Sequence, residues 1–304
     1  MEIFKTAFLM VALMLVFIAV GGYVGSEQGM MIAFLMAAGM NLFSYFFSDK
    51  LVLKRYNAIP VDESNAHGLY EIVSRLTQKA NLPMPKIYII PEEVPNAFAT
   101  GRNPSHAAVA VTEGLLKILN ENEIEGVLAH ELSHVRHYDI LTGSVAAILA
   151  GAIAMVANFA KIGTLAGQNQ NSQRNANPVI MLIIAVVMPL AATIIQMAIS
   201  REREYKADKG AAYLTGHPEW LASALSKLEN YSNSYVMQNA SEQSAHMFIV
   251  NPFGSLTSKL GVLFRTHPST SDRIAELQRH DDRLFDGSWH EPIFLLFQRQ
   301  ARAK

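Results

Sequence analysis

The stretch Val127-Leu128-Ala129-His130-Glu131-Leu132-Ser133-His134 reads His-Glu-x-x-His within a segment that we expect to be helical. A step of four residues is slightly more than one helical turn, so both imidazole rings project from the same face. Two imidazole nitrogens held in this way suit Zn²⁺, and Glu131 would stand beside the ion without binding it. From there it could take a proton from water and pass it to a leaving amine. A chance match is the alternative, but it is expected in only about one chain in a hundred of this length.

The composition indicates a membrane protein of one or two domains. Half of the 304 residues are apolar and 17% are charged, which is well below the usual quarter. The net charge of −1 gives no electrostatic basis for nucleic-acid binding. The chain has no cysteine, so a metal ion would have to be held by His, Asp or Glu side chains.

Four uncharged apolar runs, arranged as two pairs, approach the length that crosses a bilayer. They are residues 6–24, 29–47, 141–160 and 178–199. The first two runs are joined by a very short turn, which favours a helical hairpin over a cleaved signal peptide. Lys50, Lys54 and Arg55 follow this hairpin directly, so the positive-inside rule places its ends in the cytoplasm. The linker of the second pair carries Lys161 and Arg174, so a buried soluble pair is an alternative there.

The polar segments between these runs predict a small α+β domain. Helices are expected within residues 61–81, 200–214, 220–231 and 270–279, and strands at 86–90 and 106–111. Asn122 and Glu125 resemble a capping box for the helix that carries His130. The strand at 106–111 could offer an edge to an extended peptide, or it could be purely structural.

A carboxylate from a distant segment would complete a metal site. Residues 200–214 follow the fourth apolar run and contain Glu204 and, one helical turn later, Asp208. The apolar pair would return Glu204 to the membrane face that already holds His130 and His134, as a third ligand. Asp208 could then accept the free ring N–H of a ligating histidine. A charged surface helix with Arg–Glu pairs is the alternative that spacing alone leaves open.

Four motifs, in this order and spacing, resemble those of the HtpX-type membrane-bound zinc endopeptidases, distant kin of the CAAX prenyl proteases within the gluzincins. They are Pro95-Asn96-Ala97-Phe98-Ala99-Thr100-Gly101, His130-Glu131-Leu132-Ser133-His134, Arg203-Glu204-Tyr205-Lys206-Ala207-Asp208 and Arg265-Thr266-His267-Pro268. The resemblance covers nearly the whole chain up to about residue 280. Taken together the motifs are highly specific, although His-Glu-x-x-His alone does not separate zincin families.

The resemblance implies a role for each matching residue. His130, His134 and Glu204 would bind one Zn²⁺ per chain, and Glu131 would be the general base. Asp208 would orient a ligand. His267 could be the donor that steadies the oxyanion, with Arg265 and Arg273 as alternatives that could instead simply pair with Glu or Asp. Substrate would lie extended along the strand at 106–111, with Ala108, Val109 and Ala110 of that strand and also Asn96 as candidate contacts.

The expected architecture is a mainly α membrane protein with four hydrophobic helices in two hairpins and a zincin-like α+β catalytic domain that contains a small sheet. Residues 1–48 and 141–199 would form the hairpins, and 49–140 and 200–304 the two halves of the catalytic domain with a C-terminal tail. The resemblance implies an endopeptidase that cleaves misfolded or damaged membrane proteins at the cytoplasmic face of the inner membrane, as quality control. The oligomeric state is not predicted.

Three other classes of function remain as rivals. A metal-binding scaffold without turnover would need no base beside the ion. A transporter or an intramembrane protease would carry its ionisable residues inside the apolar runs. Here the motif precedes the third run, and Glu204 follows the fourth.

Overall fold

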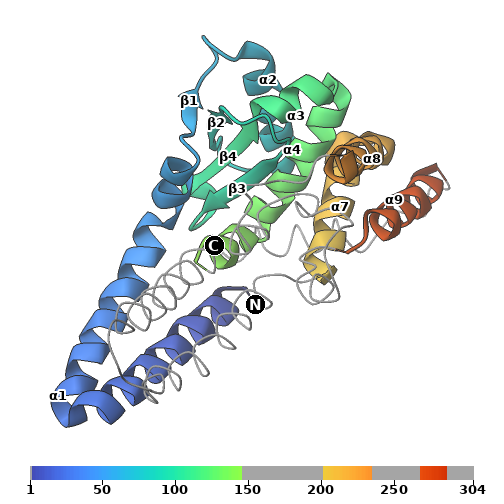
Figure 1. The fold of residues 1–304 in the computed structure, drawn as a ribbon. Coiled ribbons are helices and arrows are strands. Elements are labelled where there is room, and N and C mark those ends of the chain that lie inside the picture. Colours follow the sequence, from blue (N-terminus) through green and yellow to red (C-terminus); the bar gives the residue numbers. More distant parts are fainter. Residues whose placement is uncertain (1, 146–200, 235–267, 286–304) are drawn as a thin grey trace, which may run out of the picture.

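The computed structural model describes residues 2–145, 201–234 and 268–285. Figure 1 shows a small sheet with helices on both sides and a long N-terminal helix that projects away from it. The described elements are α1 (Glu2–Arg55), β1 (Ile59–Val61), α2 (His67–Ala80), β2 (Lys86–Ile90), β3 (Ala97–Gly101), η1 (Pro104–His106), β4 (Ala107–Thr112), α3 (Glu113–Ile118), α4 (Glu121–Arg136), α7 (Arg201–Thr215), α8 (Pro218–Ser234) and α9 (Thr270–Phe285). The helix-rich fold with a small sheet agrees with the class expected from the sequence.

The strands form one mixed sheet in the order β1-β2-β4-β3. β2 and β4 are parallel, and β3 runs antiparallel to β4 with Ala99 opposite Val109. β4 therefore lies inside the sheet, and β3 is an edge strand among the residues that the structure describes.

β4 is buried on both faces. Val109 and Val111 belong to the main core beneath the helical layer, whereas Ala108 and Ala110 pack against the end of α1 at Val52. Because both edges of β4 are also hydrogen-bonded to neighbouring strands, it cannot pair with an added peptide. The prediction that substrate lies along Ala108, Val109 and Ala110 is therefore corrected: these residues are core, and β3, not β4, is the strand at this edge of the described sheet.

The helix α1 links the apolar N-terminus to the sheet. The side-chain nitrogen of Asn41 donates a hydrogen bond to the carbonyl of Met10 at 3.0 Å, across 31 residues. A straight helix would separate these residues by about 46 Å, so the helical run folds back on itself (Figure 1). At its other end α1 continues through Arg55, and Val52 and Leu53 pack on the sheet.

One stretch of the described residues, Glu27–Phe47, has the length and hydropathy needed to cross a membrane. The two-hairpin architecture remains a prediction, because most of the second apolar pair lies outside the described residues. The division of the chain at residue 48 also remains a prediction, since α1 runs through that position without a break.

The start of α4 fixes where the His-Glu-x-x-His motif points. The side chain of Asn120 accepts a hydrogen bond from the N–H of Glu123, and the Glu123 carboxylate accepts one from the N–H of Asn120, each at 2.9 Å. The capping box predicted at Asn122 and Glu125 is therefore wrong by two residues. Glu125 instead forms an ion pair with Arg75 of α2 at 2.6 Å.

Candidate metal centre

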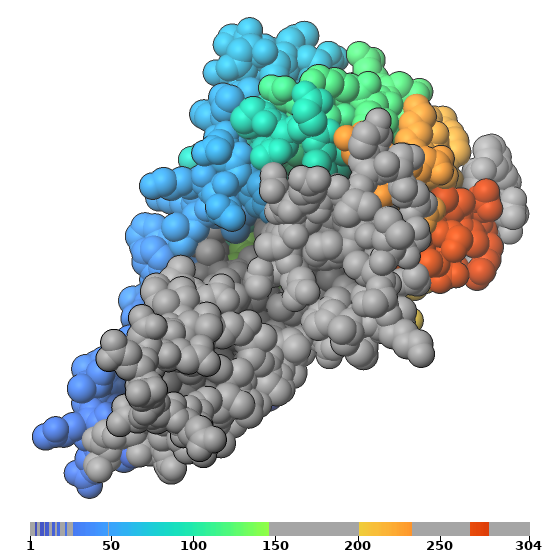
Figure 2. Space-filling model, viewed as in Figure 1, coloured from blue at the N-terminus to red at the C-terminus, as the bar shows by residue number. Residues whose placement is uncertain are grey.

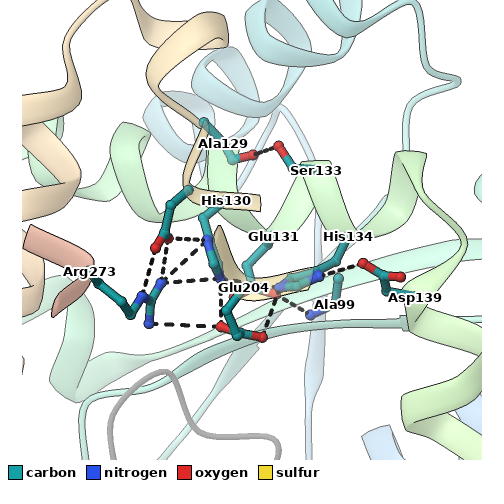
Figure 3. Close-up of polar contacts among 10 residues, drawn as sticks. Ala99, Ala129, His130, Glu131, Ser133, His134, Asp139, Glu204 and Arg273 are labelled. Atoms are coloured by element: carbon teal, nitrogen blue, oxygen red, sulfur yellow. Dashed lines mark hydrogen bonds and ion pairs between the residues drawn. The ribbon is translucent and has the colours of Figure 1, made fainter. Parts of the chain in front are cut away.

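Three side chains converge where α4 and α7 pack together (Figure 3). The Nε2 atoms of His130 and His134 lie 3.2 Å apart. Glu204 places its carboxylate oxygens 3.6 Å from Nε2 of His130 and 3.5 Å from Nε2 of His134. Ligands held at about 2.0–2.1 Å on the corners of a tetrahedron stand about 3.3 Å from one another. These buried or mostly buried groups therefore fit one metal ion.

A close approach of the two helices sets this geometry. A Cβ atom added to Gly210 of α7 would overlap Oγ of Ser133 and stand 2.8 Å from its Cβ. Ser133 is buried, and its hydroxyl donates to the carbonyl of Ala129 at 2.8 Å, so it has little freedom to move aside. Only glycine at position 210 allows α7 to approach α4 at this distance.

We expect Gly210→Ala to push α7 away from α4 and so move Glu204 from the two histidines. Overpacking of this kind costs about 1–3 kcal/mol, and metal affinity should fall with it. Thermal melting and zinc titration of the purified protein measure the two effects.

Two further variants isolate the cause. Gly68→Ala on α2 is a matched control, because a Cβ there meets nothing within 4 Å. Replacing Ser133 by glycine in the Gly210→Ala background should restore zinc binding. Unchanged zinc affinity in Gly210→Ala alone would show that this contact does not set the site.

Each histidine is held from behind by an aspartate. Nδ1 of His130 lies 2.9 Å from Oδ1 of Asp208, and Nδ1 of His134 lies 3.0 Å from Oδ2 of Asp139. A carboxylate at Nδ1 fixes the proton there and leaves the Nε2 lone pair for a metal ion. Asp208 lies where the sequence analysis expected it, whereas Asp139 was missed. The signal that could have found Asp139 is an acidic residue shortly after the second histidine.

Arg273 from α9 reaches into the centre and is 1% exposed. Its Nε and Nη2 donate to the two carboxylate oxygens of Asp208 at 2.9 and 2.6 Å. Its Nη1 lies 3.9 Å from Oε2 of Glu204. Burial alone would raise the pKa of Asp208, but the charge and hydrogen bonds of Arg273 hold that pKa below its usual value. Of the two roles considered for Arg273, oxyanion donor or partner of an acidic residue, the structure shows the pairing with an aspartate. His267 and Arg265 lie outside the described residues.

Glu131 stands between the three converging side chains and the sheet (Figure 3). Its Oε2 accepts a hydrogen bond from the N–H of Ala99 in β3 at 2.9 Å. Burial raises the pKa of Glu131, and the neighbouring histidines and the Ala99 N–H offset this only in part. A carboxylate with a raised pKa that is held beside a metal site suits both the uptake and the return of a proton.

The surroundings of the site favour a positive charge. Burial lowers the pKa of His134, but the hydrogen bond with Asp139 and the charges of Glu204 and Glu131 outweigh it and raise the pKa to about 9. The carboxylates around the ring thus stabilise a cation at this position, as a metal site requires.

Asn96, the fourth predicted substrate contact, is 3% exposed and immediately precedes β3. Its N–H donates to the hydroxyl of Thr112 at 2.8 Å, and its carbonyl accepts from the N–H of Thr112 at 2.9 Å. These bonds fix the start of the edge strand, and a contact of Asn96 with substrate remains a prediction.

Comparisons with known proteins show the family of this chain. The pattern of peptidase family M48 matches residues 63–281. The chain is 96% identical over 287 residues to a "Protease HtpX homolog" of Campylobacter concisus (strain 13826), covering 94% of this chain and 100% of that one. It is 56% identical to a protein of the same description from Sulfurovum sp. (strain NBC37-1), covering 91% and 99% of the two chains.

A solved structure is also similar. The crystal structure of S. mikatae Ste24p matches with a TM-score of 0.51 at 17% identity, which shows the fold alone. The match covers 91% of this chain and 64% of that longer one. The resemblance drawn from the four motifs is confirmed, and the chain is a metalloendopeptidase that belongs to peptidase family M48.

Proposed function

We propose that this peptidase is a zinc enzyme of the inner membrane that cleaves misfolded or damaged membrane proteins at the cytoplasmic face. The observation that carries the proposal is the convergence of His130, His134 and Glu204 around one point, with Glu131 left outside that group and turned toward β3. A purely structural zinc site would use a fourth protein ligand and would need no carboxylate poised beside it.

The residues of the chain divide the chemistry between them. Zinc, when bound, would polarise the scissile carbonyl and lower the pKa of water toward about 7. Glu131 would accept the proton of the attacking water and deliver it to the leaving amine. Asp208 would keep the proton of His130 on Nδ1, away from the metal.

The outer edge of β3 is the proposed binding strand for substrate. Alternate residues of an antiparallel strand turn both main-chain groups to the same side, and the N–H of Ala99 points away from β4, toward Glu131. The main-chain groups of Ala97 and the carbonyl of Ala99 therefore face the side where the metal centre lies, while the N–H of Ala99 is already bonded to Glu131. A substrate that paired there in an extended conformation would be held mainly by its backbone, which gives low sequence selectivity and suits unfolded polypeptides.

The membrane part of the proposal rests on α1. Within Glu27–Phe47 the side chains of Met31, Ile32 and Leu35 are about 60% exposed, which suits contact with lipid. The basic residues at the end of α1 favour the cytoplasmic side for this end, which packs on the sheet. Figure 2 shows the apolar part of α1 extending away from the strands and from α8 and α9. This arrangement supports the proposal of a multi-pass protein with its site close to the inner leaflet.

Metal removal tests the proposal directly. We expect the protein purified in detergent to contain about one zinc ion per chain and to cleave both casein and an unfolded membrane-protein reporter. A chelator should abolish both activities, and added zinc should restore them. Cleavage that persists in a sample shown by metal analysis to be free of zinc would refute the metal-dependent mechanism.

A further inference from the structure

Asp139 and Arg203 form, with His134, a second chain of contacts behind the metal centre. The first chain runs from His130 through Asp208 to Arg273. In the second, Oδ2 of Asp139 lies 3.0 Å from Nδ1 of His134, and its Oδ1 lies 4.0 Å from Nε of Arg203. Each histidine thus has an aspartate behind it and an arginine beyond the aspartate.

We propose that Asp139 is a positioning residue for the metal site and that Arg203 acts through it. This inference rests on the proposed function, because it assigns a role in holding the zinc ion. Asp139 touches neither the ion nor the substrate, and its effect passes through the ring of His134.

The backbone turn after α4 places Asp139 behind His134. α4 ends at Arg136, and the N–H groups of His137 and Tyr138 close its last turn on the carbonyls of Ser133 and Val135. Tyr138 has φ 64°, in the left-handed region, and the chain resumes a helix at residue 139. This two-residue turn places the Asp139 carboxylate beside the ring of His134 (Figure 3).

The contact decides which ring nitrogen of His134 is available to a metal ion. With its proton on Nδ1 donated to Asp139, the ring keeps a lone pair on Nε2, which faces His130 and Glu204. The opposite tautomer would place a proton on Nε2 and block the bond to zinc. The carboxylate also stops the ring from turning about its Cβ–Cγ bond.

Arg203 gives the negative charge of Asp139 its counter-charge. Both side chains are 9% exposed, and Oδ1 of Asp139 receives no hydrogen bond from the described residues. The guanidinium balances the charge of this carboxylate, so that the carboxylate can stay buried against the imidazole of His134. Arg203 directly precedes Glu204, so the pair ties His134 to the turn of α7 that carries the third proposed ligand.

The contact between Asp139 and Arg203 also connects the two chain positions that flank the apolar runs 141–160 and 178–199. Asp139 precedes these two runs, and Arg203 follows them. The contact between them therefore links the separation of these two chain positions to the geometry of His134 and Glu204.

The test is zinc affinity in Asp139→Asn, measured in the full-length protein in detergent by competition with a chromophoric chelator. Loss of a carboxylate behind a ligating histidine weakens metal binding about 10- to 100-fold, and we expect this range. The visible absorption of the cobalt-substituted protein should also change, because the ring of His134 is no longer held. Glu202→Gln is the matched control, since Glu202 is 76% exposed and adjoins Arg203.

A merely structural role predicts a different result. Asp139→Asn would then lower the melting temperature of the metal-free protein, while zinc affinity and the cobalt spectrum of the folded fraction stayed at wild-type values. That result would overturn the proposal without touching the proposed function. A wild-type protein that bound no zinc would overturn both, so the two failures are distinguishable.

A double-mutant cycle tests the part played by Arg203. If Arg203 acts through Asp139, the zinc affinity of Asp139→Asn/Arg203→Gln should nearly equal that of Asp139→Asn alone. Arg201→Gln, at an exposed position two residues earlier, is the control for loss of a positive charge. Losses that multiply in the double variant would show that Arg203 acts independently of Asp139.

Discussion

Replacing Glu131 with glutamine is expected to lower the rate of peptide cleavage by about 10²- to 10⁴-fold while zinc stays bound. Glutamine has nearly the same shape, and its side-chain oxygen can still accept the hydrogen bond from Ala99 that holds Glu131 at 2.9 Å. It cannot accept a proton from water or return one to the leaving amine. Cleavage of a membrane-protein reporter, with metal analysis of the same sample, measures both quantities.

A second acidic residue of α4 provides the control for Glu131. Glu121 is exposed in the first turn of the helix, so Glu121→Gln removes a charge without approaching the site and should retain full activity. Near-normal cleavage by the zinc-loaded Glu131→Gln protein would remove Glu131 from the role of base. Loss of zinc from that variant would mean instead that Glu131 supports the site rather than the proton transfer.

The local parts of the fold could be predicted because their signals are local. The strand expected at 86–90 matches β2, and the one at 106–111 lies within one residue of β4. The helix expected at 200–214 is displaced by one residue from α7. In each case an apolar run or a helical period decides the element, and neither depends on a distant partner.

The errors arise where distant contacts decide between equal local signals. Asn120 with Glu123 and Asn122 with Glu125 both fit a capping box, and the sequence does not rank them. The structure has the capping box at Asn120 and Glu123. Glu123 also forms an ion pair with Lys227 of α8, whereas Glu125 forms an ion pair with Arg75. Strand order is likewise non-local, so the sequence could not show that β4 lies inside the sheet.

The residues behind the metal centre were hard to find for related reasons. Arg273 reaches Asp208 only because α9 packs against α7, across 65 residues of chain. Asp139 depends on a left-handed backbone at Tyr138, a conformation that a tyrosine rarely adopts and that no sequence pattern indicates. His130, Glu131 and His134 were accessible because a single helix fixes their relative positions.

Glu204→Ala should weaken zinc binding by more than the about 10- to 100-fold expected for an aspartate behind a histidine, and cleavage should be lost with the metal. The reason lies in the charge of the site. Alanine would leave two neutral imidazoles facing the ion, and the guanidinium of Arg273, now 3.9 Å from the Glu204 carboxylate, would lose one of its counter-charges. A buried cation so close to the metal position repels a divalent ion.

Glu202→Ala is the matched control for this prediction, because Glu202 lies on the same helix and is 76% exposed. It should bind zinc and cleave substrate as the wild type does. Stoichiometric zinc in the Glu204→Ala protein would show that another group is the third ligand.

The variants Glu131→Gln and Glu204→Ala together separate metal binding from catalysis, since Glu131→Gln should keep the metal and lose turnover, whereas Glu204→Ala should lose both. A single residue serving both purposes would make the two variants behave alike, and the separate positions of Glu131 and Glu204 around the histidines argue against that result.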